Sequence, residues 1–143
     1  MSNEIDLIIE EINSYNQFSD IDIEKIVNFE IGYSYRIAKF TISTEKTFKI
    51  NQLKGILVSM NRMEQSDKDW EKKRIEFYLL MPRIAATVNN RIMSQEICDV
   101  LIAAMKLVDV STDGNKNMEN FKYFVYFFES IIAYYKFLED YDV

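Results

Sequence analysis

Apolar residues recur at three- and four-residue intervals along most of the chain, which is the spacing of a helix face rather than of a strand. The pattern predicts a first helix over residues 5–16. After a turn, a second helix is expected from Asp20 or Asp22 to about Phe40. Residues 41–49, which are polar and β-branched, are expected to form a loop.

The next two helices are predicted from capping residues and charge. Thr47 or Asn51 can cap a third helix. Asp67 and Asp69 suit the first turn of a fourth, because the helix dipole favours negative charge there. Pro82 lies inside this fourth helical pattern. Since proline has no N–H and clashes with the preceding turn, it must kink the helix or begin a new one.

Two further helices complete the pattern. Ser94, followed by the acidic Glu96, is expected to open a helix that runs to about Val108. The stretch STDGNKN, residues 111–117, is the clearest loop signal in the chain. A final helix is then expected over about residues 118–139.

The final helix contains FKYFVYFFESIIAYYKF, residues 121–137, in which nine of seventeen residues are aromatic. On a helix, the polar and small side chains form one narrow stripe: Lys122, Tyr126, Glu129, Ala133, Lys136 and Asp140. The remaining circumference is apolar, which is typical of a buried helix. We therefore interpret the aromatic stretch as core rather than as a base-stacking platform or a membrane segment. Ala133 is small enough to allow a partner helix to approach.

The composition supports one helical domain. The chain has 143 residues, of which 48% are hydrophobic, with three glycines and one proline. These values predict an all-α, compact bundle of about five to six helices over residues 1–143, with the aromatic-rich C-terminal helix in its core. Residues 1–20 would form a peripheral acidic N-terminal helix. No apolar run is long enough to span a membrane, and the acidic start lacks the features of a signal peptide, so a soluble cytoplasmic protein is expected.

Candidate catalytic groups are scarce. The sequence has no histidine, which excludes histidine-based acid–base chemistry and the usual zinc sites. Asp67, Asp69 and Glu71 lie close together but are better explained as helix-start charges than as a metal site. The lone Cys98 lies on an apolar helix face and is expected to be a buried thiol. We therefore expect no catalytic residues, no metal and no cofactor, and the chain is not expected to be an enzyme.

Charge is distributed unevenly along the chain. The net charge is −6 overall, but residues 1–35 carry −7, residues 36–91 carry +6 and residues 92–143 carry −5. In the basic middle, Lys46, Lys49 and Lys54 surround the expected start of the third helix, where unpaired backbone N–H groups can also bind phosphate. These groups could neutralise phosphates without reading bases, although each one alone is more simply explained as a solvated surface charge.

Three stretches in this order resemble a known family. They are TFKINQLKGILVSMNRM at 47–63, FYLLMPRIAATVNNR at 77–91 and the aromatic ending at 121–137. The chain resembles the small helical subunit of type III-A CRISPR interference complexes, the Csm complexes, over roughly residues 30–140. One departure is that the family usually has a small residue, glycine and arginine after the proline helix, whereas this chain reads ThrValAsnAsnArg.

The resemblance implies an all-helical subunit without catalytic residues. Several copies would stack head to tail along the backbone subunits, near the large subunit, and help to hold target RNA paired with guide RNA. By matching position, the expected RNA-backbone contacts are Lys49, Lys54, Arg83 and Arg91, and Lys46 is added on charge and position alone. The alternatives are a helical protein–protein adaptor without an RNA role and the small subunit of the related type III-B complexes.

Overall fold

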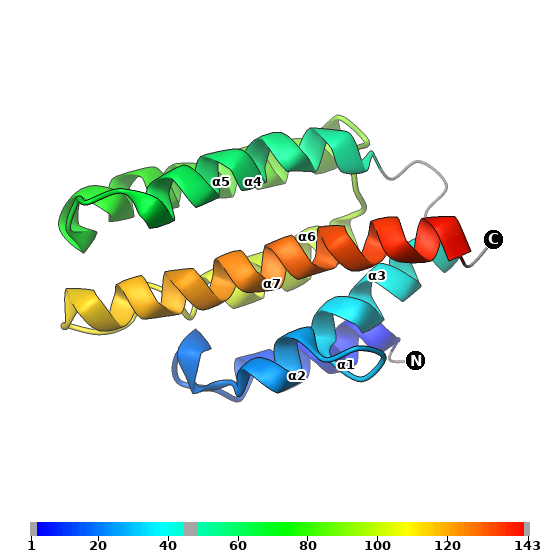
Figure 1. Ribbon diagram of the computed structural model, residues 1–143, viewed down its shortest axis with the longest axis horizontal. Coiled ribbons are helices and arrows are strands. Elements are labelled where there is room, and N and C mark those ends of the chain that lie inside the picture. The colour runs from blue at the N-terminus through cyan, green and yellow to red at the C-terminus, as the bar shows by residue number, and fades with distance from the viewer. Residues whose placement is uncertain (1–2, 45–48, 142–143) are drawn as a thin grey trace.

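The structure is a computed structural model that describes residues 3–44 and 49–141, and within these ranges every regular element is helical (Figure 1). The all-α prediction is therefore confirmed. The elements are α1 (Glu4–Asn13), the short 3₁₀ helix η1 (Phe18–Asp20), α2 (Ile23–Val27), α3 (Tyr33–Thr44), α4 (Ile50–Gln65), α5 (Trp70–Asn89), α6 (Gln95–Met105) and α7 (Gly114–Tyr141).

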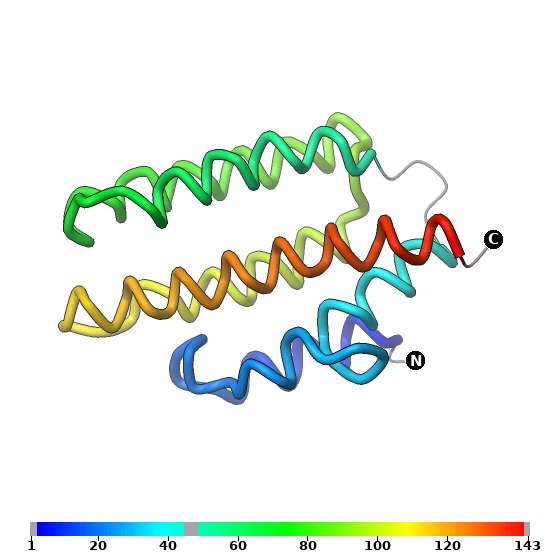
Figure 2. Tube along the Cα trace, in the orientation of Figure 1, coloured from blue at the N-terminus to red at the C-terminus, as the bar shows by residue number. Residues whose placement is uncertain are grey.

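The helices lie in three layers (Figures 1 and 2). The hairpin of α4 and α5 forms one outer layer, α6 and α7 form the middle, and the N-terminal helices form the other outer layer. Helix α7 packs against both sides, most extensively against α3 and α4, while α1 packs on α6 and α3. The start of α4, the turn between α5 and α6 and the end of α7 lie at the same end of the molecule.

Helix α7 is the buried spine predicted from the aromatic stretch. Every residue expected on the polar stripe is exposed, and most apolar residues of the remaining circumference are buried, with Phe137 the exception at 42% exposed. The buried side chains include Phe121, Phe124, Val125, Phe127, Phe128, Ile131, Ile132, Tyr135 and Leu138. Phe18 of η1 adds to this cluster, with its ring centroid 5.6 Å from that of Phe127. The interpretation of this stretch as core is therefore confirmed.

The predicted helix from Asp20 or Asp22 to about Phe40 is wrong, because residues 28–32 interrupt it and separate α2 from α3. Gly32 lies so close to the end of α2 that a Cβ there would be 2.6 Å from the backbone nitrogen of Asn28. Glu30, in the same turn, has a φ of 73°. Asn28 takes an extended ψ of 139°, which ends α2, and the chain turns before α3 begins.

The loop predicted to begin at residue 41 is also wrong in its first part, because α3 continues to Thr44. Thr41 is buried and its hydroxyl donates to the carbonyl of Ile37 at 2.8 Å. Thr44 donates in the same way to Phe40 at 2.7 Å. Each hydroxyl is therefore satisfied inside the helix, and the β-branched side chains do not break it.

Helix α4 begins at Ile50, with Lys49 as its N-cap residue, and Asn51 lies inside the helix rather than capping it. The other expected cap, Thr47, lies outside the described residues. Asp69 caps α5 through the backbone N–H of Lys72, whereas Asp67 precedes the helix. Ser94 caps α6 as predicted, accepting from the N–H of Ile97.

Helix α5 runs through Pro82 without ending, so a new helix does not begin there. Pro82 is exposed, and its ring stands on the solvent face of α5. Water can therefore donate a hydrogen bond to the backbone carbonyl of Tyr78, which Pro82 leaves without its usual N–H donor.

The predicted loop at 111–117 is shorter than expected because α7 begins at Gly114, where the carboxylate of Asp113 accepts the N–H of Asn115 at 2.9 Å.

Helix α1 is fastened by burial and by polar contacts. Ile5, Ile8 and Ile12 are completely buried. Asn3 and Asp6 form a reciprocal capping box at its start. An ion pair joins Glu4 to Arg36 of α3.

On α6, Cys98 is buried, as expected from its apolar helix face.

The two glycines Gly32 and Gly55 give a matched test of this packing. We expect Gly32→Ala to destabilise the protein by about 1–3 kcal/mol, because the new methyl group would meet backbone atoms on three sides. Gly55→Ala should stabilise it by about 0.5–1 kcal/mol, since Gly55 lies in α4 with open space around it. Urea unfolding followed by circular dichroism measures both. Equal stability of Gly32→Ala and wild type would contradict the tight turn.

Candidate nucleic-acid interface

Two of the predicted RNA-contacting residues meet at the end of the bundle where α4 begins. The backbone N–H of Lys49 donates to the carbonyl of Ile92 at 3.0 Å, which joins the start of α4 to the turn between α5 and α6. Lys49 and Arg91 are exposed on the two sides of this junction. The structure therefore brings together two cations that are 42 positions apart in the sequence.

The start of α4 adds a partial positive charge to this junction. No side chain of the described residues caps α4, and its first turn contains no acidic residue. In contrast, α1, α5 and α6 have side-chain caps and acidic first turns. The dipole of α4 and the backbone N–H groups at its start therefore favour an anion beside Lys49.

Arg91 holds an unusual backbone conformation at this junction. Its φ is 57°, in the left-handed region that glycine adopts most readily. The turn is a Schellman motif: the N–H of Ile92 donates to the carbonyl of Thr87 at 2.8 Å, and the N–H of Arg91 donates to that of Val88 at 3.0 Å. Arginine thus occupies the position at which most such motifs have glycine.

Lys54 lies about one turn into α4 and faces Lys136 on the neighbouring helix α7. The neighbouring Lys136 amine and the positive charge that it carries lower the pKa of Lys54. Neither lysine has an ion-pair partner among the described residues. Two adjacent ammonium groups without a counter-ion are suited to a bound anion such as phosphate. Sequence reasoning missed Lys136, whose only signal was its place on the exposed stripe of α7.

Arg83 lies apart from these groups. It projects from α5 toward α4, where its guanidinium donates to the Ser59 hydroxyl at 3.1 Å. Ser59 follows Lys54 by five residues, so the two side chains point about 140° apart around α4. Arg83 and Lys54 therefore flank opposite sides of α4. Lys46, the fifth predicted contact, lies outside the described residues.

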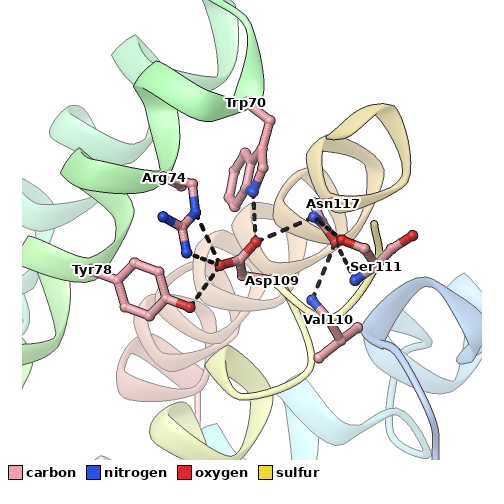
Figure 3. Close-up of polar contacts among 7 residues, drawn as sticks. All are labelled: Trp70, Arg74, Tyr78, Asp109, Val110, Ser111 and Asn117. Atoms are coloured by element: carbon pink, nitrogen blue, oxygen red, sulfur yellow. Dashed lines mark hydrogen bonds and ion pairs between the residues drawn. The ribbon is translucent and has the colours of Figure 1, made fainter. Parts of the chain in front are cut away.

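A second cluster of charged and polar groups surrounds Asp109, in the connection between α6 and α7 (Figure 3). Its carboxylate accepts hydrogen bonds from the Trp70 indole at 2.8 Å, the Tyr78 hydroxyl at 2.7 Å and the Arg74 guanidinium at 2.9 Å. Asn117 of α7 also donates to it at 3.2 Å. The carboxylate therefore fastens the first half of α5 to the start of α7.

The Asp109 cluster is organised for stability rather than for chemistry. The side chain is only 12% exposed, and burial alone would raise its pKa. The hydrogen bonds from Tyr78, Trp70 and Arg74 outweigh that effect and hold the pKa of Asp109 below its ordinary value. Its oxygens are occupied by protein donors, which leaves no obvious place for a substrate. In the described part of the chain, no group of three or more histidine, cysteine or acidic residues could hold a metal ion.

Comparison with known proteins decides between the candidate families. A family model described as Csm2 Type III-A matches residues 24–140. The chain belongs to this family. It is therefore a small subunit of the type III-A Csm complex rather than of the related type III-B complexes. No curated protein and no solved structure matches the chain.

The Csm2 match covers α3 to α6 completely and all of α7 but its last residue, together with every basic residue of the candidate interface described above. Helix α1 lies outside it. None of the helices in residues 3–44 and 49–141 is long and apolar enough to cross a membrane. The resemblance found in the sequence is thus confirmed at the level of the family, while the RNA contacts stay predictions.

The positive φ of Arg91 predicts that two substitutions that remove the same charge will differ in their effect on the stability of this Csm2 protein. Arg91→Gly should raise the free energy of unfolding by about 1 kcal/mol, because glycine adopts a positive φ without strain. Arg91→Ala removes the same charge but keeps a Cβ in the left-handed region, so it should give no such gain. Thermal unfolding of the three proteins measures the difference. Identical midpoints for the two variants would contradict the assigned turn.

The Asp109 cluster predicts a specific acid sensitivity. Its pKa is lower in the folded protein than in the unfolded chain, so its contribution is complete above the unfolded pKa of about 3.9. That contribution is lost as the pH falls through the folded pKa. Asp109→Asn should therefore destabilise the protein by about 1–3 kcal/mol at pH 7 and flatten the acid limb of its stability profile. Urea unfolding between pH 2 and 7 checks this, with the exposed Asp140→Asn as control.

Proposed function

We propose that this chain acts in the cytoplasm as a non-catalytic Csm subunit that holds the guide RNA–target RNA duplex through its phosphates. The observation that carries the proposal is the junction of Lys49, Arg91 and the start of α4, which no side chain of the described residues caps. It combines two exposed side-chain cations with the positive end of a helix dipole, and Lys54 and Lys136 extend the positive surface toward α7. The family match supports a role beside RNA, because it makes the chain a component of an RNA-guided complex.

Contacts of this kind are independent of base sequence. Lysine, arginine and helix N-termini bind phosphate oxygens, which are the same at every nucleotide. Such contacts suit a subunit of a complex in which base pairing between guide and target carries the specificity. Arg83 would contact the backbone separately, because it lies on the other flank of α4.

We further propose that several copies stack head to tail along the backbone subunits. The basic segment 36–91 lies between two acidic segments, so the basic surface of one copy can meet an acidic surface of the next. Charge reversal of exposed acidic residues in 1–35 and 92–143 should then weaken assembly of the complex at low salt. Unchanged assembly would count against this arrangement and leave the RNA contacts standing.

The RNA role predicts a change in salt dependence. In the reconstituted complex, Lys49→Ala and Arg91→Ala should each weaken target RNA binding for every target sequence. Each should also reduce the slope of log affinity against log salt concentration by about 0.7–0.9 per copy of the subunit, because one phosphate contact is lost. Filter binding at several salt concentrations measures the slope.

The matched control is Lys106→Ala. Lys106 is exposed and directly follows α6, a helix that runs away from the junction (Figure 1). Its removal changes the net charge equally but should leave the slope unchanged. A slope that stays at the wild-type value in both junction variants would overturn the assignment of Lys49 and Arg91.

The second candidate is a helical protein–protein adaptor without an RNA role. Large apolar side chains exposed on the outer face of α5, including Ile75 and Leu79, are the observation that favours it. Under this alternative, the lysine and arginine variants would behave as wild type, and substitutions of the exposed apolar residues would abolish assembly.

A further inference from the structure

Three large aromatic side chains are exposed side by side near the C-terminal end of α7. Phe29, in the turn between α2 and α3, is 49% exposed, and Phe137 and Tyr141 of α7 are 42% and 76% exposed. The ring centroid of Phe137 lies 5.7 Å from that of Phe29 and 4.9 Å from that of Tyr141. We call these three residues the aromatic platform. They include the two rings of the C-terminal helix that the core leaves most exposed.

The aromatic platform is held in place by rings beneath it. Phe29 also contacts Tyr35 of α3 and Tyr134 of α7, with ring centroids 4.9 and 6.0 Å away. Tyr35 is buried, and the hydroxyl of Tyr134 donates to the backbone carbonyl of Val27. Because Phe29 meets Tyr35 edge to face, its orientation is fixed. The exposed rings are therefore arranged for a flat ligand before that ligand binds.

The platform is a contiguous patch rather than a set of scattered apolar residues. Ile31, two residues after Phe29, extends it and is also exposed. Leaving such side chains in water has a free-energy cost that isolated exposed residues spread thinly over a surface. A contiguous apolar patch with polar residues at its rim is typical of a binding site.

The rim of the platform carries lysines from three helices. Lys136 precedes Phe137 on α7 and lies beside Lys54 of α4, so the paired ammonium groups of the candidate interface adjoin the platform. Lys39 lies one turn after Tyr35 on α3, is exposed, and has no ion-pair partner among the described residues. Lysines beside stacked aromatic rings are the combination with which proteins bind single-stranded nucleic acid.

A hollow beside the platform leaves room for a nucleotide. Its volume is about 580 Å³, which lies within the range of pockets that hold small ligands. It adjoins the platform because Tyr35, which supports Phe29, is also part of its lining. Lys39 lines it as well, so the hollow offers a ring and a cation together.

The charges next to the rings favour a base there rather than a phosphate. Glu30 follows Phe29 and Asp140 precedes Tyr141, so acids lie next to the platform. A phosphate on the rings would be repelled by these acids, whereas an uncharged base would not. The lysines at the rim instead suit the phosphates that join one base to the next.

We propose that the aromatic platform binds unpaired bases of single-stranded RNA by stacking, while Lys54 and Lys136 bind the adjoining phosphates. The bases are unpaired because a base inside a duplex has both faces covered by its neighbours and offers none to a protein ring. The platform therefore holds nucleotides that the guide–target pairing leaves free. The inference rests on the proposed RNA role and extends it from phosphates to bases.

The test measures binding of the full chain to two RNA strands by fluorescence anisotropy at low salt. One strand is a short oligoadenylate, and the other has the same length and phosphates but lacks the bases. Wild type should bind the strand with bases at least about fivefold more tightly, because each stacked base adds to the affinity. Phe29→Leu and Phe137→Leu remove a ring but keep an apolar side chain. Each should lower the affinity for that strand about fivefold or more and leave the affinity for the abasic strand unchanged.

Tyr126→Leu is the matched control. Tyr126 is an exposed ring on the same helix, but it contacts Tyr123 rather than the platform, so its removal should change neither affinity. Lys136→Ala should weaken binding of both strands, since it removes a phosphate contact. Thermal unfolding checks that the variants are folded. If Phe29→Leu is unstable, Tyr141→Leu replaces it, because Tyr141 is at the exposed end of α7.

Equal affinity of wild type for the two strands would overturn the stacking proposal and leave the phosphate contacts standing. Binding of neither strand would overturn it as well. So would an arginine-rich peptide that binds more tightly than either RNA strand and is lost in Phe137→Leu, since the platform would then take a protein partner. A preference for bases, together with unchanged salt slopes in Lys49→Ala and Arg91→Ala, would support the platform and count against the junction.

Discussion

The enclosure of α7 is the constraint on which the rest of the structure depends. A helix of 28 residues that is apolar over most of its circumference must be covered on nearly every side, and α2, η1, α3, α4, α5 and α6 all pack against it. The side of α7 that reaches solvent is chiefly the polar stripe, with a few exposed residues such as Phe137 near the C-terminal end of the helix. The other helices therefore have few alternatives, because each must present an apolar face to the same central rod.

Helix α7 also connects two different regions, the polar contacts around its first turns and the basic residues near its other end. At its first turns, the buried Asn117 and Asn120 hold neighbouring connections: Asn117 accepts the N–H of Ser111 at 2.9 Å, and Asn120 accepts that of Ser19 at 2.9 Å. Near its other end, α7 carries Lys136 to Lys54. Polar contacts between elements are thus gathered at the Asp109 end, and the cations Lys49, Lys54 and Arg91 of the candidate interface lie where α4 begins or shortly after it.

Hydrophobic periodicity was sufficient for the parts of the fold that depend on local pattern. It predicted the buried and exposed sides of α7 and the burial of Cys98, while residue type and charge predicted the Ser94 cap. It could not predict the break before α3, which arises because the turn brings Gly32 against the backbone of α2. Nor could it identify Asn117 and Asn120 as buried, since an asparagine near a loop has the same sequence signal whether its amide meets water or backbone.

The candidate interface was predictable in its residue types but not in its arrangement. Charge and the family resemblance selected Lys49 and Arg91, but their proximity depends on one backbone hydrogen bond between Lys49 and Ile92. The partner of Lys54 comes from α7, more than eighty residues away in the sequence. The Lys54–Lys136 pair therefore links the binding of an anion to the uptake of a proton. An anion bound between the two ammonium groups would raise the lowered pKa of Lys54 again, so binding in alkaline solution takes up protons, and affinity there declines at a lower pH than for an isolated lysine.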